Sequence, residues 1–494
     1  MKIALMHYHL QPGGVTTVIR EQFAVLRRVV DCLILTGESS NEPNQALSRG
    51  KPFAAGSNAA EEAAFRAAVR VVPGIGYDSR DGGGLDPSRM AKTVMKAMTE
   101  AWGSPADILH VHNPTLNKNS SLPAVLRLLQ EEGIALFLQV HDLAEDGRPS
   151  AFYPSGEYPE DCHYGTVNSR DRAALLASGL CPDGIHLLFN VVRPVVWSSD
   201  GVAPLRRSRL AGRRMIYPVR GIRRKNIGEA LFLGVLLGSD VSVTLPPRNA
   251  ADRARYEAWK DFAQRHGVEA GFDAGLACRL DELMSQADAA VTTSVNEGFG
   301  FSFLEPWTAG VAVMGRRLDH VCRDFEEAGV SLPYLYSSLQ VPIVLFDAPG
   351  FFIRWRVAIT AAFQSFGRAI DGAAMERACS AMTAGGFVDF AALDEEAQRE
   401  VIARTMSSQK VRQEIEALNP IVEGLRSALA APDPSLAEGN RTVIIARYGP
   451  ERYSELLRGV YRAVVENPVR HRINRGALLD RFLRLKRFRM LEQR

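Results

Sequence analysis

The chain has 494 residues, of which 46% are hydrophobic and 23% charged, a composition that excludes a disordered, collagen-like or coiled-coil protein. Its length exceeds one ordinary core and predicts two or three domains. No run approaches the ~18 consecutive apolar residues of a membrane-spanning helix. The six cysteines form no CxxC pair, which favours a reducing, cytoplasmic compartment over a disulfide framework.

The net charge of +3 is unevenly distributed along the chain. Residues 470–494 contain nine Lys or Arg and two acidic residues, a net charge of +7, which leaves −4 for the rest. A mildly acidic body disfavours nucleic acid as a partner. The basic tail needs an explanation of its own.

The first half alternates strand and helix patterns, which is typical of a parallel, doubly wound sheet. The run 2–10 predicts a first strand, and its polar His7 and His9 argue against a secretory signal. A helix is expected over 15–29 and a strand over 31–37. Two later strands, 107–113 and 134–142, end in polar residues. A loop at 38–60 and a basic linker at roughly 197–214 interrupt the pattern.

The alternation restarts in the second half, with strands expected at 214–220, 242–247 and 311–315. We therefore predict an α/β protein of two Rossmann-like domains, 1–195 and 196–446, facing across a cleft. A helical insertion is expected at about 385–432. The last segment, 447–494, reads as a helix that crosses back to the first domain, followed by the basic tail.

The most informative motif is VNEGFGFSFLEPW, residues 295–307. Glu297 and Glu305 flank a glycine turn, and each carboxylate can accept hydrogen bonds from a pair of sugar hydroxyls. A helix opening near Gly300 would present free N–H groups to an oxygen. A surface Glu followed by a helix-start Glu explains the same spacing equally well.

A second motif, RGIRRK at 220–225, places cations between a strand end and a helix start. Arg forks two oxygens and Lys acts as a point charge, so Arg220 and Lys225 are candidates for a diphosphate site. A solvated basic turn is the alternative for Arg223 and Arg224.

Weaker signals lie in the first half. Gly13 and Gly14 precede a helix, where a tight turn is the simpler explanation. His141 and Asp142 end a strand, a position that faces the ligand in this fold class. The HxH pairs suit zinc, but no third ligand at a typical spacing supports a metal, and none is predicted.

Together these residues resemble retaining GT-B glycosyltransferases of glycosyltransferase family four, over about residues 1–465. The resemblance implies a nucleotide-sugar donor of the UDP-glucose or GDP-mannose type, and a hydroxyl acceptor. Arg220 and Lys225 would then neutralise the donor diphosphate and its leaving group. It also implies that no metal or other cofactor is needed, because these cations replace one.

The remaining roles also follow from the resemblance. Glu305 would hold the ribose, and Glu297 with the backbone of Gly298, Phe299, Gly300 and Phe301 would hold the transferred sugar. His141, with Asp142 beside it, would contact the same sugar. Gly13 and Gly14 would close on the phosphates or the acceptor.

Several alternatives stay open. The acceptor is expected to be a small soluble glycerate, sugar phosphate or glycoside, with a lipid or polysaccharide as the alternative. The tail places Leu478, Leu479, Phe482, Leu485 and Phe488 at helical spacing among arginines, which suits a peripheral contact with the inner membrane face, the protein's own body or another subunit of a homo-oligomer. A nucleotide-sugar epimerase and an inactive scaffold are the competing functions.

Overall fold

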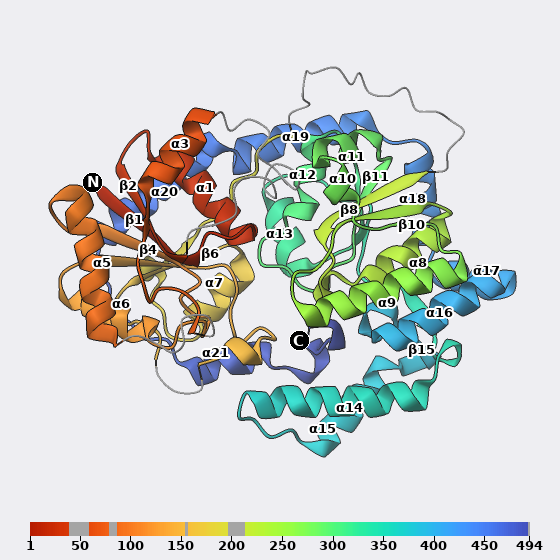
Figure 1. Cartoon of the computed structure of the whole chain (residues 1–494). Helices are drawn as coiled ribbons and strands as arrows, with labels where there is room; N and C mark the ends of the chain where they lie inside the picture. Colours follow the sequence, from red (N-terminus) through yellow and green to blue (C-terminus); the bar gives the residue numbers. More distant parts are fainter. Residues whose placement is uncertain (39–58, 79–85, 154–156, 196–212, 493–494) are drawn as a thin grey trace. The chain divides into compact units, whose positions relative to one another are not determined.

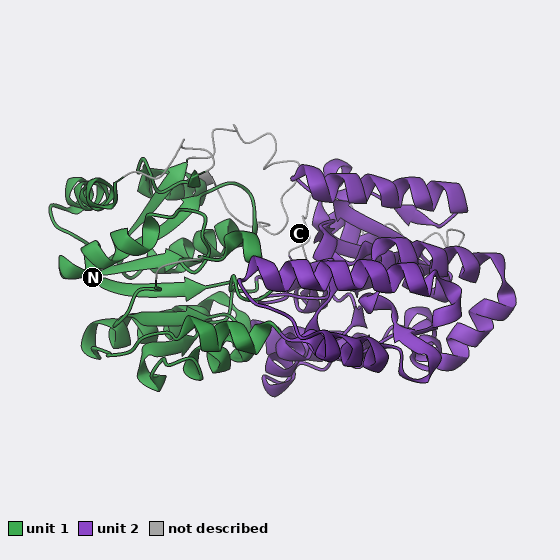
Figure 2. Ribbon diagram, turned by 90° about the horizontal axis from the view of Figure 1, so that it is seen from below, with its two compact units in different colours: residues 1–46, 56–192, 446–483 green, residues 47–55, 193–445, 484–494 purple. Residues whose placement is uncertain are grey.

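The structure is a computed structural model, and it describes residues 1–38, 59–78, 86–153, 157–195 and 213–492. They form two compact units (Figure 2). Unit 1 holds the described residues up to 192 together with 446–483, and unit 2 holds 193–445 and the residues from 484 onward. The expected loop at 38–60 and basic linker lie almost entirely outside the described residues.

Unit 1 is built on a seven-stranded parallel sheet (Figure 1). Its strand order is β3-β2-β1-β4-β5-β6-β7, with bounds β1 Lys2–His9, β2 Asp31–Glu38, β3 Val69–Val71, β4 Ile108–His112, β5 Ala135–Val140, β6 His163–Thr166 and β7 Ile185–Leu187. Alternate residues of β1 enter two different cores, since Ala4 and Met6 pack on one face and Ile3 and Leu5 on the other. The sheet is therefore buried on both faces, as in other doubly wound folds.

Helices cover both faces of this sheet. Those of unit 1 are α1 Gly14–Leu26, α3 Ala59–Ala68, α5 Pro87–Trp102, α6 Leu122–Glu131, α7 Ser169–Leu176, α20 Pro450–Glu466 and α21 Arg475–Phe482. Side chains of α1, α3 and α20 share one core, and those of α5, α6, α7 and α21 share the other. The C-terminal helix α20 thus belongs to unit 1, through Tyr453, Leu457 and Tyr461.

Unit 2 has a six-stranded parallel sheet in the order β10-β9-β8-β11-β12-β13. The strands are β8 Arg214–Arg220, β9 Asp240–Leu245, β10 Ala270–Gly271, β11 Ala289–Thr292, β12 Val313–Arg316 and β13 Leu335–Tyr336. Its helices are α8 Ile227–Leu237, α9 Ala250–His266, α10 Ala274–Ala277, α11 Leu280–Gln286, α12 Glu305–Thr308 and α13 Asp319–Glu327. Ten of the eleven residues of α8 are buried, so this apolar helix is a central element of the core.

The helical part of unit 2 begins earlier than the predicted insertion at 385–432. It comprises α14 Ala348–Ser365, α15 Gly372–Met382, α16 Glu395–Ser407, α17 Gln409–Leu418 and α18 Ile421–Ala430, with an antiparallel pair β14 Gln340–Pro342 and β15 Phe387–Asp389. Helices α14 and α15 lie side by side (Figure 1), and Arg356 of one pairs with Glu376 of the other. Helix α19, Pro434–Tyr448, spans the division between the units.

The basic tail is folded onto the protein itself. Leu478 and Leu479 of α21 are buried, the former in a core of unit 1. Phe488 and Met490 join the main core of unit 2, and Leu491 packs with Val295 and Ala391. Most of the apolar stripe that suggested a membrane contact is therefore used inside the protein.

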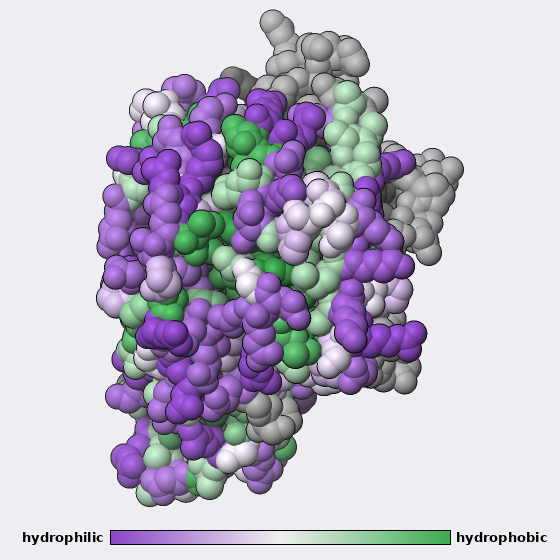
Figure 3. All heavy atoms as spheres, turned by 90° about the vertical axis from the view of Figure 1, so that its left-hand side faces the viewer, coloured by the Kyte–Doolittle hydropathy of each residue, from purple (hydrophilic) through white to green (hydrophobic). Residues whose placement is uncertain are grey.

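Figure 3 shows one face of the molecule, on which hydrophilic side chains predominate and hydrophobic ones form separate small patches. Scattered apolar groups of this kind are normal on a folded protein. None of the described helices has the length and apolarity that crossing a bilayer requires.

Candidate active site

The predicted residues of unit 2 gather where its strand order reverses. Strands β8 and β11 are neighbours, and the chain continues from them in opposite directions across the sheet. Arg220 is the last residue of β8, and residues 293–297 follow β11. In open α/β sheets ligands bind outside the carboxyl ends of the strands at this switch point.

The loop that carries Lys225 is tied to the segment after β11. Asn226 has a left-handed backbone with φ of 51°, an angle that asparagine tolerates better than most residues. The Tyr217 hydroxyl donates to the Lys225 carbonyl over 2.7 Å, and the Thr293 hydroxyl donates to the Asn226 carbonyl over 3.0 Å. The Val295 N–H donates to the Arg224 carbonyl over 2.9 Å. These bonds hold the loop that carries Lys225 against the segment that follows β11.

Lys225 and Glu297 form an ion pair across these loops. Their side chains are 13% and 8% exposed, so the pair lies in a partly desolvated place. Burial alone would raise the pKa of Glu297, but the charges of Lys225 and then Arg224 outweigh it, and the pKa is lowered. The carboxylate is therefore ionised at neutral pH. The His320 ring lies 3.1 Å from the Glu297 carbonyl, which also fixes the backbone there.

Arg220 brings a second cation to the same edge. Its guanidinium donates to the Pro246 carbonyl over 2.8 Å. Burial, followed by repulsion from Arg248, lowers the pKa of Arg220 to about 10, so it keeps its charge at pH 7. Two guanidinium groups that repel each other are stabilised by an anion placed between them. Arg248 was missed by the sequence analysis.

The glycine motif differs from the expected helix. A 3-10 turn covers Phe301–Phe303, and the α-helix that follows, α12, has four residues and begins at Glu305 itself. A helical turn does begin after Gly300, as expected, but it is a 3-10 turn, and the α-helix that contains Glu305 is separate from it. Pro306 lies in the first turn of α12 and has no N–H, so it cannot continue a hydrogen-bond ladder from the turn before it.

Gly300 itself is required by the fold. Its φ is 86°, and a Cβ there would lie 2.8 Å from atoms of Phe303 and of Val321. Phe299 is 5% exposed and its ring packs against Phe301 and Phe325, so its side chain is part of the core. Glu305 is 8% exposed. The motif therefore shapes a turn between the two predicted carboxylates.

In unit 1 the strand order reverses between β1 and β4. Gly13 ends the short loop that follows β1, and α1 begins at Gly14 with no side-chain cap. Gly13 has an extended backbone that any residue adopts, with φ of 177°. A Cβ on Gly14 would meet nothing within 4 Å. The helix has 13 residues, and its first turn therefore has neither a capping side chain nor a side chain at Gly14.

His141 and Asp142 follow β5 at the same edge of the sheet. Asp142 pairs with Arg148 over 2.5 Å. Burial lowers the pKa of His141 to about 4, and the nearby Asp142 only partly offsets this, so the imidazole is neutral at pH 7. Both backbone N–H groups donate to the side chain of Asn113, which the sequence analysis did not single out.

The other strand-end histidines belong to a buried polar network. His110 contacts the Tyr461 hydroxyl over 2.8 Å and the Gln139 amide oxygen over 2.9 Å. His7 and His112 are also buried. Among the residues that the structure describes, no three His, Cys, Asp or Glu side chains are arranged to hold a metal ion.

Two contacts from the helical part reach the Lys225 loop. Glu395 of α16 accepts from Arg223 through two bonds of 2.7 and 2.9 Å. Gln398 of the same helix donates to the Asn226 side chain over 2.9 Å. These partners lie 172 residues along the chain from the loop, and no sequence signal indicated them.

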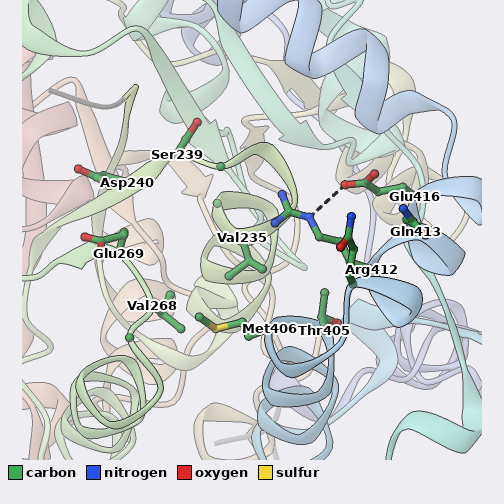
Figure 4. Close-up of a pocket in the computed structure, with 14 residues that line it drawn as sticks. Val235, Ser239, Asp240, Val268, Glu269, Thr405, Met406, Arg412, Gln413 and Glu416 are labelled. Carbon is green, nitrogen blue, oxygen red and sulfur yellow. Dashed lines mark hydrogen bonds and ion pairs between the residues drawn. The ribbon is translucent and has the colours of Figure 1, made fainter. Parts of the chain in front are cut away.

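A cavity of about 630 Å³ in unit 2 lies elsewhere (Figure 4). It is lined by the ends of α8, α16 and α17 and by Asp240 and Glu269, which stand at the amino ends of β9 and β10. That is the edge of the sheet opposite to Arg220 and Glu297. This cavity is separate from the candidate active site.

Comparisons with known proteins place the fold. No known family profile matches the chain. Mannosylglucosyl-3-phosphoglycerate synthase from Petrotoga mobilis is 24% identical in an alignment of 349 positions that covers 65% of this chain and 66% of the relative. The chain thus spans just under two thirds of that relative's length.

Two solved structures resemble the chain over almost its whole length. Anabaena HepE in complex with UDP is 12% identical with a TM-score of 0.50, over 93% of this chain and 99% of HepE. A glycosyltransferase from Rickettsia africae is 10% identical with a TM-score of 0.51, over 94% of this chain and 99% of that one. With two parallel, doubly wound sheets in separate units, the chain has the GT-B fold.

Proposed function

We propose that this protein is a retaining glycosyltransferase. It moves a hexose from a nucleotide-sugar donor to a hydroxyl of a small soluble acceptor of the glycerate class. The observation that carries the proposal is the Lys225–Glu297 pair, which lies with Arg220 at the switch point of unit 2. A cation and a carboxylate held together there suit a ligand that has both phosphates and sugar hydroxyls.

In this proposal the cations act on the diphosphate. Arg220 forks two phosphate oxygens, and Lys225 supplies a point charge to the oxygen that leaves the anomeric carbon. Positive charge already fixed at that oxygen stabilises the transition state more than the ground state, because negative charge develops there. This is the role that a divalent metal would otherwise have.

The carboxylates act on the hydroxyls. Glu297, ionised and held by its ion pair, accepts hydrogen bonds from the transferred sugar, and Glu305 accepts them from the ribose. His141 contacts the transferred sugar, and Gly13 and Gly14 offer their N–H groups to phosphate or acceptor. The acceptor hydroxyl attacks the anomeric carbon on the face from which the diphosphate departs, and its proton passes to the departing oxygen.

The relatives support the donor and acceptor classes. One neighbour was crystallised with UDP and also with UDP and glucose. The Petrotoga relative is named for a product that contains two hexoses and a 3-phosphoglycerate group. A lipid acceptor has less support, because most of the tail's apolar side chains are buried within the protein.

A transfer assay tests the proposal. The full chain is incubated with UDP-glucose or GDP-mannose and with 3-phosphoglycerate or its glucoside, and products are identified by mass spectrometry and NMR. A new glycosidic bond with the anomeric configuration of the donor is expected from one pair. An epimerised nucleotide sugar with no new bond, or only hydrolysed donor with every acceptor, would contradict it.

A further inference from the structure

The carboxyl ends of β4 and β5 in unit 1 are joined by a pair of histidine rings. His112, the last residue of β4, lies with its Nδ1 2.9 Å from Nε2 of His141. The rings are stacked, with centroids 5.2 Å apart and planes inclined by 11°. A hydrogen bond between two ring nitrogens requires that one of them carries the proton.

The other nitrogen of His112 decides which ring donates. Its Nε2 is buried and has no hydrogen-bond partner among the described residues. If His112 accepted the proton of His141, this Nε2 would carry a hydrogen and leave a buried N–H unpaired. If His112 donates from Nδ1, Nε2 is only an unpaired acceptor. Orphaned buried N–H groups are rarer than under-satisfied acceptors, so His112 donates.

This assignment fixes the proton of His141. Its Nε2 accepts from His112, and burial keeps the ring neutral by lowering its pKa to about 4. A neutral imidazole has one N–H, which must therefore be on Nδ1. Within the described part of the chain Nδ1 makes no hydrogen bond, so this proton is available to a ligand.

The backbone of His141 is held by the residue that follows His112 at the end of β4. Asn113, the residue after His112, has a positive φ of 54°. Its side-chain oxygen accepts from the N–H of His141 over 2.8 Å and from that of Asp142 over 3.1 Å. Its own N–H donates to the Gln139 carbonyl over 2.8 Å. The end of β4 thus holds both the ring and the main chain of His141.

We propose that His112 is a positioning residue that sets the tautomer of His141, so that His141 presents a neutral Nδ1–H donor to an oxygen of the bound sugar. The sugar in this statement rests on the proposed function, whereas the tautomer does not. The assignment excludes a general-base role for Nδ1 and a cationic role for the ring.

The tautomer is read directly by NMR of the full chain labelled with ¹⁵N-histidine, with the His141 signals assigned from a His141→Gln variant. We expect the hydrogen on Nδ1 and none on Nε2. In His112→Phe the aromatic ring stays but the donor is lost, and an Nε2–H population of His141 should appear. In His112→Asn the side-chain amide takes the place of Nδ1–H, and the original tautomer should return.

Activity gives the second readout. We expect kcat/KM to fall about tenfold in His112→Phe, as for one lost hydrogen bond, and to recover in His112→Asn. A proton on Nε2 in the unmodified chain overturns the proposal, even where a variant does not fold. An unchanged tautomer in folded His112→Phe also overturns it. A chain with the expected tautomer but no transfer activity contradicts the proposed function and leaves the positioning role of His112 intact.

Discussion

Lys225 and Glu297 neutralise each other in the free protein, and this has a consequence for donor binding. In the proposed function, an incoming diphosphate would compete with the Glu297 carboxylate for the Lys225 ammonium, while an incoming sugar would compete with Lys225 for the carboxylate. The pair therefore keeps both groups charged and in place before the substrate arrives. Burial makes the electrostatic effect stronger than it would be in water.

Substituting Lys225 tests its role at the leaving oxygen. In Lys225→Ala we expect kcat/KM to fall by a factor of about 100 or more, as when one preorganised donor to a developing anion is removed. Initial rates of nucleoside diphosphate release, with acceptor present, measure this. Lys410→Ala is the control, since Lys410 is an exposed residue of α17. Equal loss in both variants, or none in Lys225→Ala, would refute the assignment.

The buried residue Glu145, which lies near Arg475 of the tail, should make the free energy of unfolding depend on pH. Burial raises its pKa to about 7, against an unfolded value of ~4.3. Between these values the folded chain holds a proton that the unfolded chain has lost, so stability falls as pH rises. In Glu145→Gln this fall should shrink, by up to about 3 kcal/mol.

Urea unfolding at pH 5 and pH 8 measures the difference for the wild type, Glu145→Gln and the exposed control Glu100→Gln. The control should keep the pH dependence of the wild type. The same pH dependence in Glu145→Gln would show that Glu145 titrates at its ordinary pKa.

At the scale of elements, helix α16 holds the Lys225 loop through Glu395 and Gln398. A minimal doubly wound unit does not need helix α16. Through the contacts of this helix, the helical part of unit 2 helps to hold the Lys225 loop in place. The loop is thus fixed from two sides, by the segment after β11 and by α16.

Removing one of these contacts should weaken donor binding without unfolding the unit. In Glu395→Ala we expect Kd for the nucleoside diphosphate to rise about tenfold, because Arg223 loses its bidentate partner and the loop gains alternative conformations. Glu396→Ala is the matched control, since Glu396 lies next to it on α16 and its side chain is 60% exposed. Isothermal titration compares the two, and equal affinities would rule out this role for α16.

Those parts of the fold that rest on local patterns could be predicted from the sequence. The strand ends at Arg220 and before His141 were visible because apolar runs stop there at polar residues. Helix α14 was not placed, although Phe351, Trp355 and Ile359 repeat at four-residue spacing, because aromatic and β-branched residues also suit strands. The break in the glycine motif depends on Pro306, whose missing N–H was not weighed.

The parts of the site that were missed depend on tertiary contacts. Glu395 forms an ion pair with Arg223 although the two lie far apart in the sequence. Arg248 lowers the pKa of Arg220 by charge repulsion, and no sequence pattern links these two residues. Asn113 directly follows the HVH run, and a polar residue at a strand end was the available signal for it. His112 was noted only as one member of an HxH pair, because its partner is on another strand.

At the scale of the whole molecule, the tail contributes to both units. Arg475 donates to the Tyr153 carbonyl over 2.5 Å and lies over the rings of Phe152 and Tyr158 in unit 1. Leu491, 1% exposed, packs against Val295 in unit 2. Val295 in turn donates its N–H to the Arg224 carbonyl, so the turn Met490–Glu492 supports the candidate site.

Shortening the side chain of Leu491 tests this support. We expect Leu491→Ala to weaken nucleotide binding and to lower stability by about 2–5 kcal/mol, because a cavity forms beside Val295. Arg487→Ala, an exposed tail residue, should change neither quantity. Thermal unfolding with and without nucleotide separates the two effects. Unchanged binding in Leu491→Ala would mean that the tail serves stability alone.

Calorimetric titration of UDP and GDP into the full chain, Lys225→Ala and Lys410→Ala tests the central claim most directly. We predict that one nucleotide binds the wild type and Lys410→Ala with the same affinity, and that Lys225→Ala binds it at least about tenfold more weakly. A hundredfold excess of that nucleotide over its Kd should stabilise the wild type by about 2.7 kcal/mol. No binding of either nucleotide, or equal binding by all three proteins, would contradict a nucleotide-sugar site built on Lys225.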